Sequence, residues 1–301
     1  LTQANGSTLL VGGLANLQAA SWDITLTNAG ANNFGTLTFV GQSVSIKENS
    51  DMQLAGASSA GNVTLETTGN LTQAGGATMA INAKAEFVVS NGNITLVNAG
   101  ANNFGSIKFD GLNVSIRENS DTQLTSDSKA TGNLVLTSAG NLTQVAGATL
   151  NVSGNANLQV AGDITLTNAG ANNFGTLTFN GSVVSIVENS AMTVSGSSVA
   201  TSNLNLTSAG SMNQAAGSSI TGNAVTVLNA GSGNDIVFNA STNDFGSVSI
   251  VAGNNVTIVD TNALVLAAST VSGNASITAN GAITTSGALA LNGLASTIYA
   301  Q

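Results

Sequence analysis

One stretch, residues 24–39, returns nearly letter for letter along the chain and constrains the fold more than any other feature. It reads ITLTNAGANNFGTLTF and recurs at residues 94–109 and 164–179, a spacing of 70 residues. A diverged fourth copy covers residues 236–250. A fixed period of this kind is typical of repeat architectures, in which each unit buries its apolar face against its neighbours.

The segments between the Gly and Asn turns alternate apolar residues with small polar ones, which is the period of a half-buried strand. No segment keeps a helical period for more than about two turns, so we expect no helix of consequence. The residues predicted to point inward are Ile24, Leu26, Leu37, Phe39, Val44, Ile46, Val63 and Leu65, and those predicted to point outward are Thr25, Thr38, Ser45 and Thr64.

Short strands joined by tight turns are compatible with a sandwich or a solenoid, and the 70-residue period favours the solenoid. A stacked coil would place each loop over its counterpart in the next repeat. The sequence therefore predicts an all-β fold, a right-handed parallel β-helix of four ~70-residue repeats with about three coils each, four shorter coils being the alternative. The predicted domain is one continuous solenoid over residues 1–301, with repeats at 1–70, 71–141, 142–211 and 212–282 and a partial repeat at 283–301.

Composition excludes several classes of function. The 301 residues contain no cysteine, histidine or proline, which rules out disulfides, His or Cys metal sites and His-based catalysis. The net charge of −9 has the wrong sign for a nucleic-acid-binding protein. No run approaches the roughly 18 apolar residues of a membrane span. The absence of proline suits strands that donate hydrogen bonds to both neighbours.

Two residue types recur at fixed places beside the Asn-rich loop of each repeat. The phenylalanines are predicted to fill the core, because a buried ring contributes a large apolar area, and the asparagines to support turn conformations. The alternatives are a surface aromatic platform for sugars and a binding loop. These structural repeat positions are Phe34, Phe104, Phe174, Phe245, Asn32, Asn102, Asn172 and Asn243.

The acidic residues do not predict a catalytic site. Glu48 and Asp51 recur as Glu118 and Asp121, but the third copy pairs Glu188 with an alanine. The segment 231–236 resembles a calcium-binding glycine-aspartate repeat, yet such sites need stacked copies and this chain has one. We therefore expect no catalytic residue, no bound metal and no cofactor.

The chain resembles, over essentially its whole length, the repeat region of filamentous-haemagglutinin-like exoproteins. The runs that carry the resemblance are residues 233–236, 243–248, 255–264, 273–278 and 281–283. The resemblance implies a right-handed β-helix within a large bacterial surface adhesin, exported through an outer-membrane transporter by two-partner secretion.

These observations together predict a structural shaft of an extracellular bacterial adhesin or surface filament, located at the cell surface, and not an enzyme. The alternative is a β-solenoid module that binds carbohydrate or ice, and the recurring Thr-x-Thr pairs are the observation that suggests it. The expected partners are neighbouring copies or flanking repeats placed end to end, with host or cell-surface glycans as further candidates. The chain begins at Leu1 and neither end carries a cap, so we expect it to lie within a longer rod or to stack into a filament.

Overall fold

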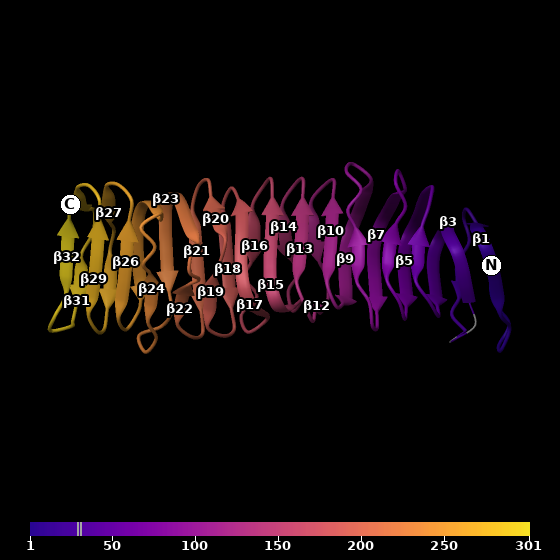
Figure 1. Cartoon of the computed structure of the whole chain (residues 1–301), viewed down its shortest axis with the longest axis horizontal. Coiled ribbons are helices and arrows are strands. Elements are labelled where there is room, and N and C mark those ends of the chain that lie inside the picture. Colours follow the sequence, from indigo (N-terminus) through magenta and orange to yellow (C-terminus); the bar gives the residue numbers. More distant parts are fainter. Residues whose placement is uncertain (29, 31) are drawn as a thin grey trace. The chain divides into compact units, whose positions relative to one another are not determined.

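A computed structural model describes residues 1–28, 30 and 32–301 of the chain, and these residues form strands and turns without a helix. None of them therefore builds a helix able to cross a membrane. The chain divides into two compact units, Leu1–Gly154 and Asn155–Gln301. Within each unit the strands pair in parallel with the next coil of the chain, and they lie side by side as successive rungs in Figure 1. This is the predicted β-solenoid architecture.

The strands are short because a Gly, Asn or Ser turn interrupts each run of alternating residues. The strands of the first unit are β1 (Leu9–Gln18), β2 (Ile24–Leu26), β3 (Asn32–Glu48), β4 (Met52–Leu54), β5 (Ala57–Thr67), β6 (Leu71–Gln73), β7 (Thr78–Val89), β8 (Ile94–Leu96), β9 (Asn102–Gly111), β10 (Val114–Glu118), β11 (Thr122–Leu124), β12 (Ser128–Ala130), β13 (Leu134–Ser138) and β14 (Leu142–Gln144). Strand β15 (Leu150–Val160) contains the boundary between the units.

The second unit repeats the same kinds of strand. Its strands are β16 (Ile164–Leu166), β17 (Asn172–Gly181), β18 (Val184–Glu188), β19 (Met192–Val194), β20 (Ser197–Ala200), β21 (Leu204–Ser208), β22 (Met212–Gln214), β23 (Ser219–Asn229), β24 (Ile236–Phe238), β25 (Asp244–Ala252), β26 (Val256–Asp260), β27 (Leu264–Leu266), β28 (Ser269–Val271), β29 (Ala275–Ala279), β30 (Ile283–Thr285), β31 (Leu289–Leu291) and β32 (Thr297–Ala300).

Two ladders of paired strands run through the first unit, and the chain visits them alternately. Ladder A has as successive register partners Ile24, Val44, Val63, Ala85, Ile107 and Leu124, so five coils span the 100 residues between 24 and 124. Ladder B pairs Ala15, Leu37 and Leu54, and then Met52, Leu71, Ile94, Val114 and Leu134. One coil therefore takes about 20 residues, and a 70-residue repeat makes three and a half coils.

Because each repeat makes three and a half coils, the extra half coil places successive copies of the repeated stretch within a unit in different ladders. Ile24 begins the repeated stretch in ladder A, whereas its copy Ile94 lies in ladder B. The second unit shows the same arrangement, because Ile164 pairs with Val184 in one ladder and Ile236 pairs with Val256 in the other. The expectation that each loop lies over its counterpart is therefore wrong. Because seven half coils are an odd number, the two copies within each unit lie in different ladders.

The core consists of the alternating apolar residues, as predicted. All eight residues expected to point inward are buried, with exposed fractions of 3% or less. Of the four polar residues expected to point outward, Thr25 is exposed and Ser45 and Thr64 are half-buried. Thr38 departs from the prediction, because the turn at Gly56 on the next coil covers it and its hydroxyl donates a hydrogen bond to the carbonyl of Ala55.

Candidate functional site

A buried polar cluster, here called the carboxyl clamp, recurs in every full copy of the repeated stretch. In the second copy the side-chain amide of Asn102 donates hydrogen bonds to the carbonyls of Leu96 at 3.0 Å and Arg117 at 3.1 Å. The backbone N–H of Phe104 donates to Oε1 of Glu118 at 2.9 Å. The clamp thus joins the start of one strand to the end of a strand half a coil later.

The contact between the phenylalanine N–H and the acidic side chain holds in the other copies. The N–H of Phe34 donates to Glu48 at 2.7 Å, that of Phe174 to Glu188 at 3.0 Å and that of Phe245 to Asp260 at 2.7 Å. The asparagines Asn32, Asn102, Asn172 and Asn243 and the phenylalanines Phe34, Phe104, Phe174 and Phe245 are all buried. The asparagines therefore satisfy buried backbone carbonyls, and the rings occupy the interior and not a surface platform.

The sequence analysis missed the acidic members of the clamp. Glu48, Glu118, Glu188 and Asp260 are each about 1% exposed, although glutamate and aspartate are almost never fully buried without a partner. The signal was present in the constant spacing of 14 residues from phenylalanine to glutamate, which becomes 15 in the fourth copy. The comparison of acids with one another, as possible catalytic pairs, does not reveal this spacing, because it relates each acid to a phenylalanine.

Burial controls the ionisation of these acids. Desolvation raises the pKa of Glu118 and that of Glu188 to about 7, against the lowering effect of the Phe N–H and Ser hydroxyl groups. The same cause raises the pKa of Glu48 and that of Asp260. Each clamp holds a single carboxyl group enclosed in the core, where no substrate can reach it. A carboxyl group enclosed in this way fits a structural role.

A second set of Asn and Asp side chains links the coils at the surface. The side-chain oxygens of Asn70 and Asn93 accept hydrogen bonds from the backbone N–H of the corresponding residue one coil later, at 2.9 and 3.1 Å. Asp235 is held in the same way by Asn254 and Asn255, which lowers its pKa. The calcium-like segment 231–236 thus uses its carboxylate within the fold, and the described residues hold no group of three metal-ligating side chains.

Charged side chains gather on the outer face of ladder A. Lys47 pairs with Glu66 at 2.8 Å, and Glu86 lies between Lys84 at 2.9 Å and Lys108 at 2.6 Å. The outward row of this ladder runs Thr25, Ser45, Thr64, Glu86 and Lys108. Charges therefore interrupt the threonines, and this face does not present the flat threonine array of the ice-binding alternative.

Two surface grooves of the first unit occupy equivalent places in successive repeats. The first groove is lined by Ala20, Ser21, Val40, Gly41, Gln42, Ser59, Ala60, Gly61 and Asn82. The second groove is lined by Val88, Val89, Ser90, Asn91, Asp110, Gly111, Leu112, Lys129 and Thr131. Seven lining positions of one are those of the other shifted by 70 residues, and each groove measures about 470 Å³. The repeat itself therefore encodes the groove.

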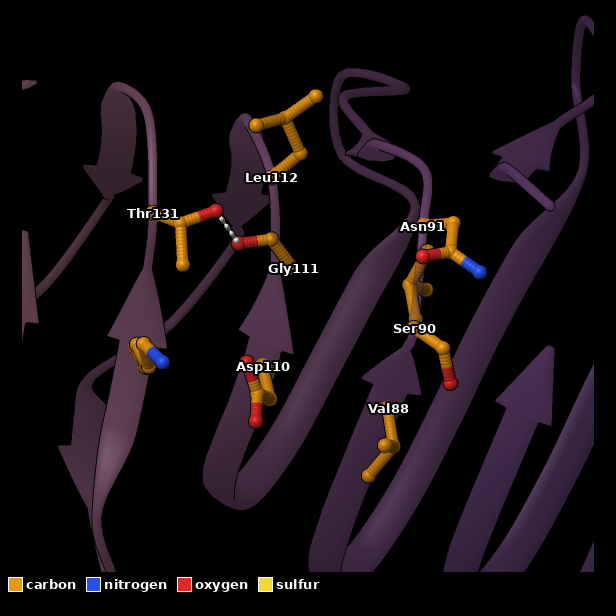
Figure 2. A pocket seen from close by; sticks show the side chains of 9 residues that line it. Val88, Ser90, Asn91, Asp110, Gly111, Leu112 and Thr131 are labelled. Carbon is orange, nitrogen blue, oxygen red and sulfur yellow. Dashed lines mark hydrogen bonds between the residues drawn. The ribbon is translucent and has the colours of Figure 1, made fainter. Parts of the chain in front are cut away.

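The coil geometry explains the recess. In the second groove, the chain crosses from ladder A to ladder B in only seven residues between Ile107 and Val114. The crossings on the coils before and after take nine residues, from Ala85 to Ile94, and ten, from Leu124 to Leu134. The short crossing lies between the two longer ones, and Gly111 within it lines the groove (Figure 2).

Comparison with known families identifies the repeat. The chain matches the family described as "Repeats of unknown function (DUF5649)" in five segments, residues 1–40, 41–108, 111–180, 181–252 and 253–301. It belongs to the DUF5649 repeat family. No curated protein and no solved structure matches it significantly. The central DUF5649 segment spans residues 111–180, and so contains one copy of the repeated stretch and its Phe174.

Proposed function

We propose that this DUF5649 chain is a structural shaft segment of an extracellular bacterial adhesin or surface filament, and not an enzyme. One observation carries the proposal: each repeat supplies its own core residues, carboxyl clamp and coil-to-coil Asn contacts, so length can grow by repetition without a new core. The likeness to filamentous-haemagglutinin-like repeats supports the surface location and export through an outer-membrane transporter.

The connections between the ladders support the same proposal. In the first unit the crossings between ladder positions range from seven residues, Leu37 to Val44, to fourteen, Leu71 to Ala85. Binding and catalytic sites on solenoids usually lie on longer insertions. Compact crossings suit a shaft whose partners are neighbouring copies or flanking repeats end to end.

Surface labelling of the native cells tests the proposal. Antibodies raised against the 301-residue chain should label intact cells, on extended surface material, and limited protease treatment of intact cells should remove the label. Permeabilised cells provide the control for total antigen. Label confined to permeabilised cells, and resistant to external protease, would refute an extracellular shaft.

A further inference from the structure

The two grooves of the first unit share a shape but differ in chemistry. Positions that are Val40 and Ser59 in the first groove are Asp110 and Lys129 in the second, where they are register partners on adjacent coils of the same face. The second groove has thus acquired one carboxylate and one ammonium group, while the first remains neutral. The two grooves thus share a backbone plan and differ in the chemistry of their linings.

The charges of the second groove are not used within the fold. The other lysines of this face, Lys47, Lys84 and Lys108, each form an ion pair with a glutamate. Among the residues that the structure describes, no carboxylate lies within 4.0 Å of the ammonium of Lys129, although Asp110 is its neighbour on the adjacent coil. Lys129 is exposed and Asp110 half-buried, so both remain accessible to a ligand.

Hydrogen-bonding and apolar groups surround this pair. Ser90 and Asn91 lie on one wall and Thr131 on the other, where its hydroxyl reaches the carbonyl of Gly111 at 3.5 Å (Figure 2). Val88 lies in the same outward row as Asp110, and Leu112, 45% exposed, offers an apolar contact at the rim. The volume of about 470 Å³ falls within the roughly 300–1,000 Å³ of small-molecule sites.

We propose that the second groove binds an acidic saccharide, a sugar unit that carries one carboxylate. Lys129 pairs with the carboxylate of the sugar, and Asp110, Ser90, Asn91 and Thr131 bond its hydroxyls. Val88 and Leu112 contact the C–H face of the ring. Asp110 beside Lys129 disfavours a single group that carries two negative charges, such as a phosphate ester, more than it disfavours the one carboxylate of a sugar unit, because like charges repel. The inference rests on the groove alone and does not require the shaft proposal.

The chain contains its own control for the test. The substitutions Asp110→Val and Lys129→Ser install the residues of the first groove, which the same backbone already accommodates at Val40 and Ser59. Binding of trigalacturonate to the 301-residue chain is measured by NMR titration, with maltotriose as the neutral counterpart. A Lys47→Ser variant removes a lysine of the same face that lies outside the groove. Circular dichroism verifies that each variant is folded.

We expect saturable binding of trigalacturonate with a Kd on the order of 1 mM, weakened at least about tenfold in the double variant and unchanged in Lys47→Ser. Maltotriose should bind at least about tenfold more weakly than trigalacturonate. Three results would each overturn the assignment: no saturable binding by the unmodified chain, equal binding by the double variant, or equal binding of maltotriose. Surface labelling of cells is independent of all three, so either proposal can fail alone.

Discussion

Buried carboxyl groups distinguish this solenoid at the scale of single residues. Oε1 of Glu188 accepts hydrogen bonds from the Phe174 N–H and the Ser190 hydroxyl, whereas its Oε2 is buried without a partner among the described residues. An ionised carboxylate in that position would leave a charged oxygen unsolvated. The protonated acid fits the clamp better, in keeping with its raised pKa.

The first prediction concerns pH. Glu118 and Glu188 have a pKa of about 7 in the fold and 4.5 as the ordinary value, so the folded chain binds more protons than the unfolded chain between these values. The stability that they contribute is present below pH 4.5 and is lost as pH rises through 7. The urea midpoint should therefore be lower at pH 8 than at pH 5.

Variants separate this effect from the general charge of the chain. A nearby acid raises the pKa of three of the clamp carboxyls further; the pairs are Asp51 with Glu48, Asp121 with Glu118 and Asp244 with Asp260. Glu188 has an alanine at the matching place. Glu118→Gln with Glu188→Gln should reduce the difference between the two midpoints, and Glu66→Gln at the surface should not. A midpoint that rises from pH 5 to pH 8 in the unmodified chain would contradict the prediction.

The second prediction concerns the clamp asparagine. Asn102→Ala leaves the carbonyls of Leu96 and Arg117 without their donor and removes the bond from Gln73 at 2.6 Å. Because a buried group left unpaired costs about 1–3 kcal/mol, the unfolding free energy should fall by about 2–4 kcal/mol. The neighbouring Asn103 is exposed, and Asn103→Ala should cost less than about 1 kcal/mol. Equal losses in urea denaturation would argue against the clamp.

At the scale of elements, glycines within strands allow neighbouring coils to approach closely. Gly105, in β9, follows the clamp phenylalanine and lies against the preceding coil. A Cβ placed there would lie 2.4 Å from the carbonyl oxygen of Asn82 and 2.6 Å from that of Ala83. The equivalent glycines Gly35 and Gly246 meet carbonyl oxygens of the preceding coil at 2.4 and 2.5 Å. Only glycine allows the backbones to approach this closely.

The third prediction follows from this contact. Gly105→Ala must push two backbones apart, so we expect a fall in melting temperature of several degrees, corresponding to about 1–3 kcal/mol. Gly75→Ala is the matched control, because its Cβ would meet nothing within 4 Å and its φ is not positive. Thermal unfolding followed by circular dichroism should separate the two variants. A tolerated Gly105→Ala would mean that the coils can shift without cost.

Hydrogen bonds and apolar burial hold each unit together at the scale of the molecule. The described residues contain no group of three metal-ligating side chains, and the chain has no cysteine. The fourth prediction is therefore that a chelator leaves the melting temperature of the 301-residue chain unchanged. Melting curves with and without EDTA, repeated with added calcium, measure this. A fall of several degrees with EDTA, restored by calcium, would reveal a site that these side chains do not explain.

The sequence by itself determined the fold class, the strands and most of the core. Its alternation placed Ile24, Leu26 and Phe39 inside, because side chains of a strand point to opposite faces with a period of two. Its 70-residue period indicated a solenoid, because a period reports which residues are equivalent along the chain.

Only the tertiary structure decided how the repeats are phased and which polar residues are buried. The number of residues per coil cannot be deduced from the 70-residue period alone. Strand pairing shows that Ile24 and Ile94 lie in different ladders. Burial of Glu118 and Thr38 depends on contacts with segments beyond their own strands, which no local alternation reports. The groove at Gly111 lies where a short crossing is flanked by longer crossings on the adjacent coils. Only strand pairing in the folded chain brings these crossings side by side.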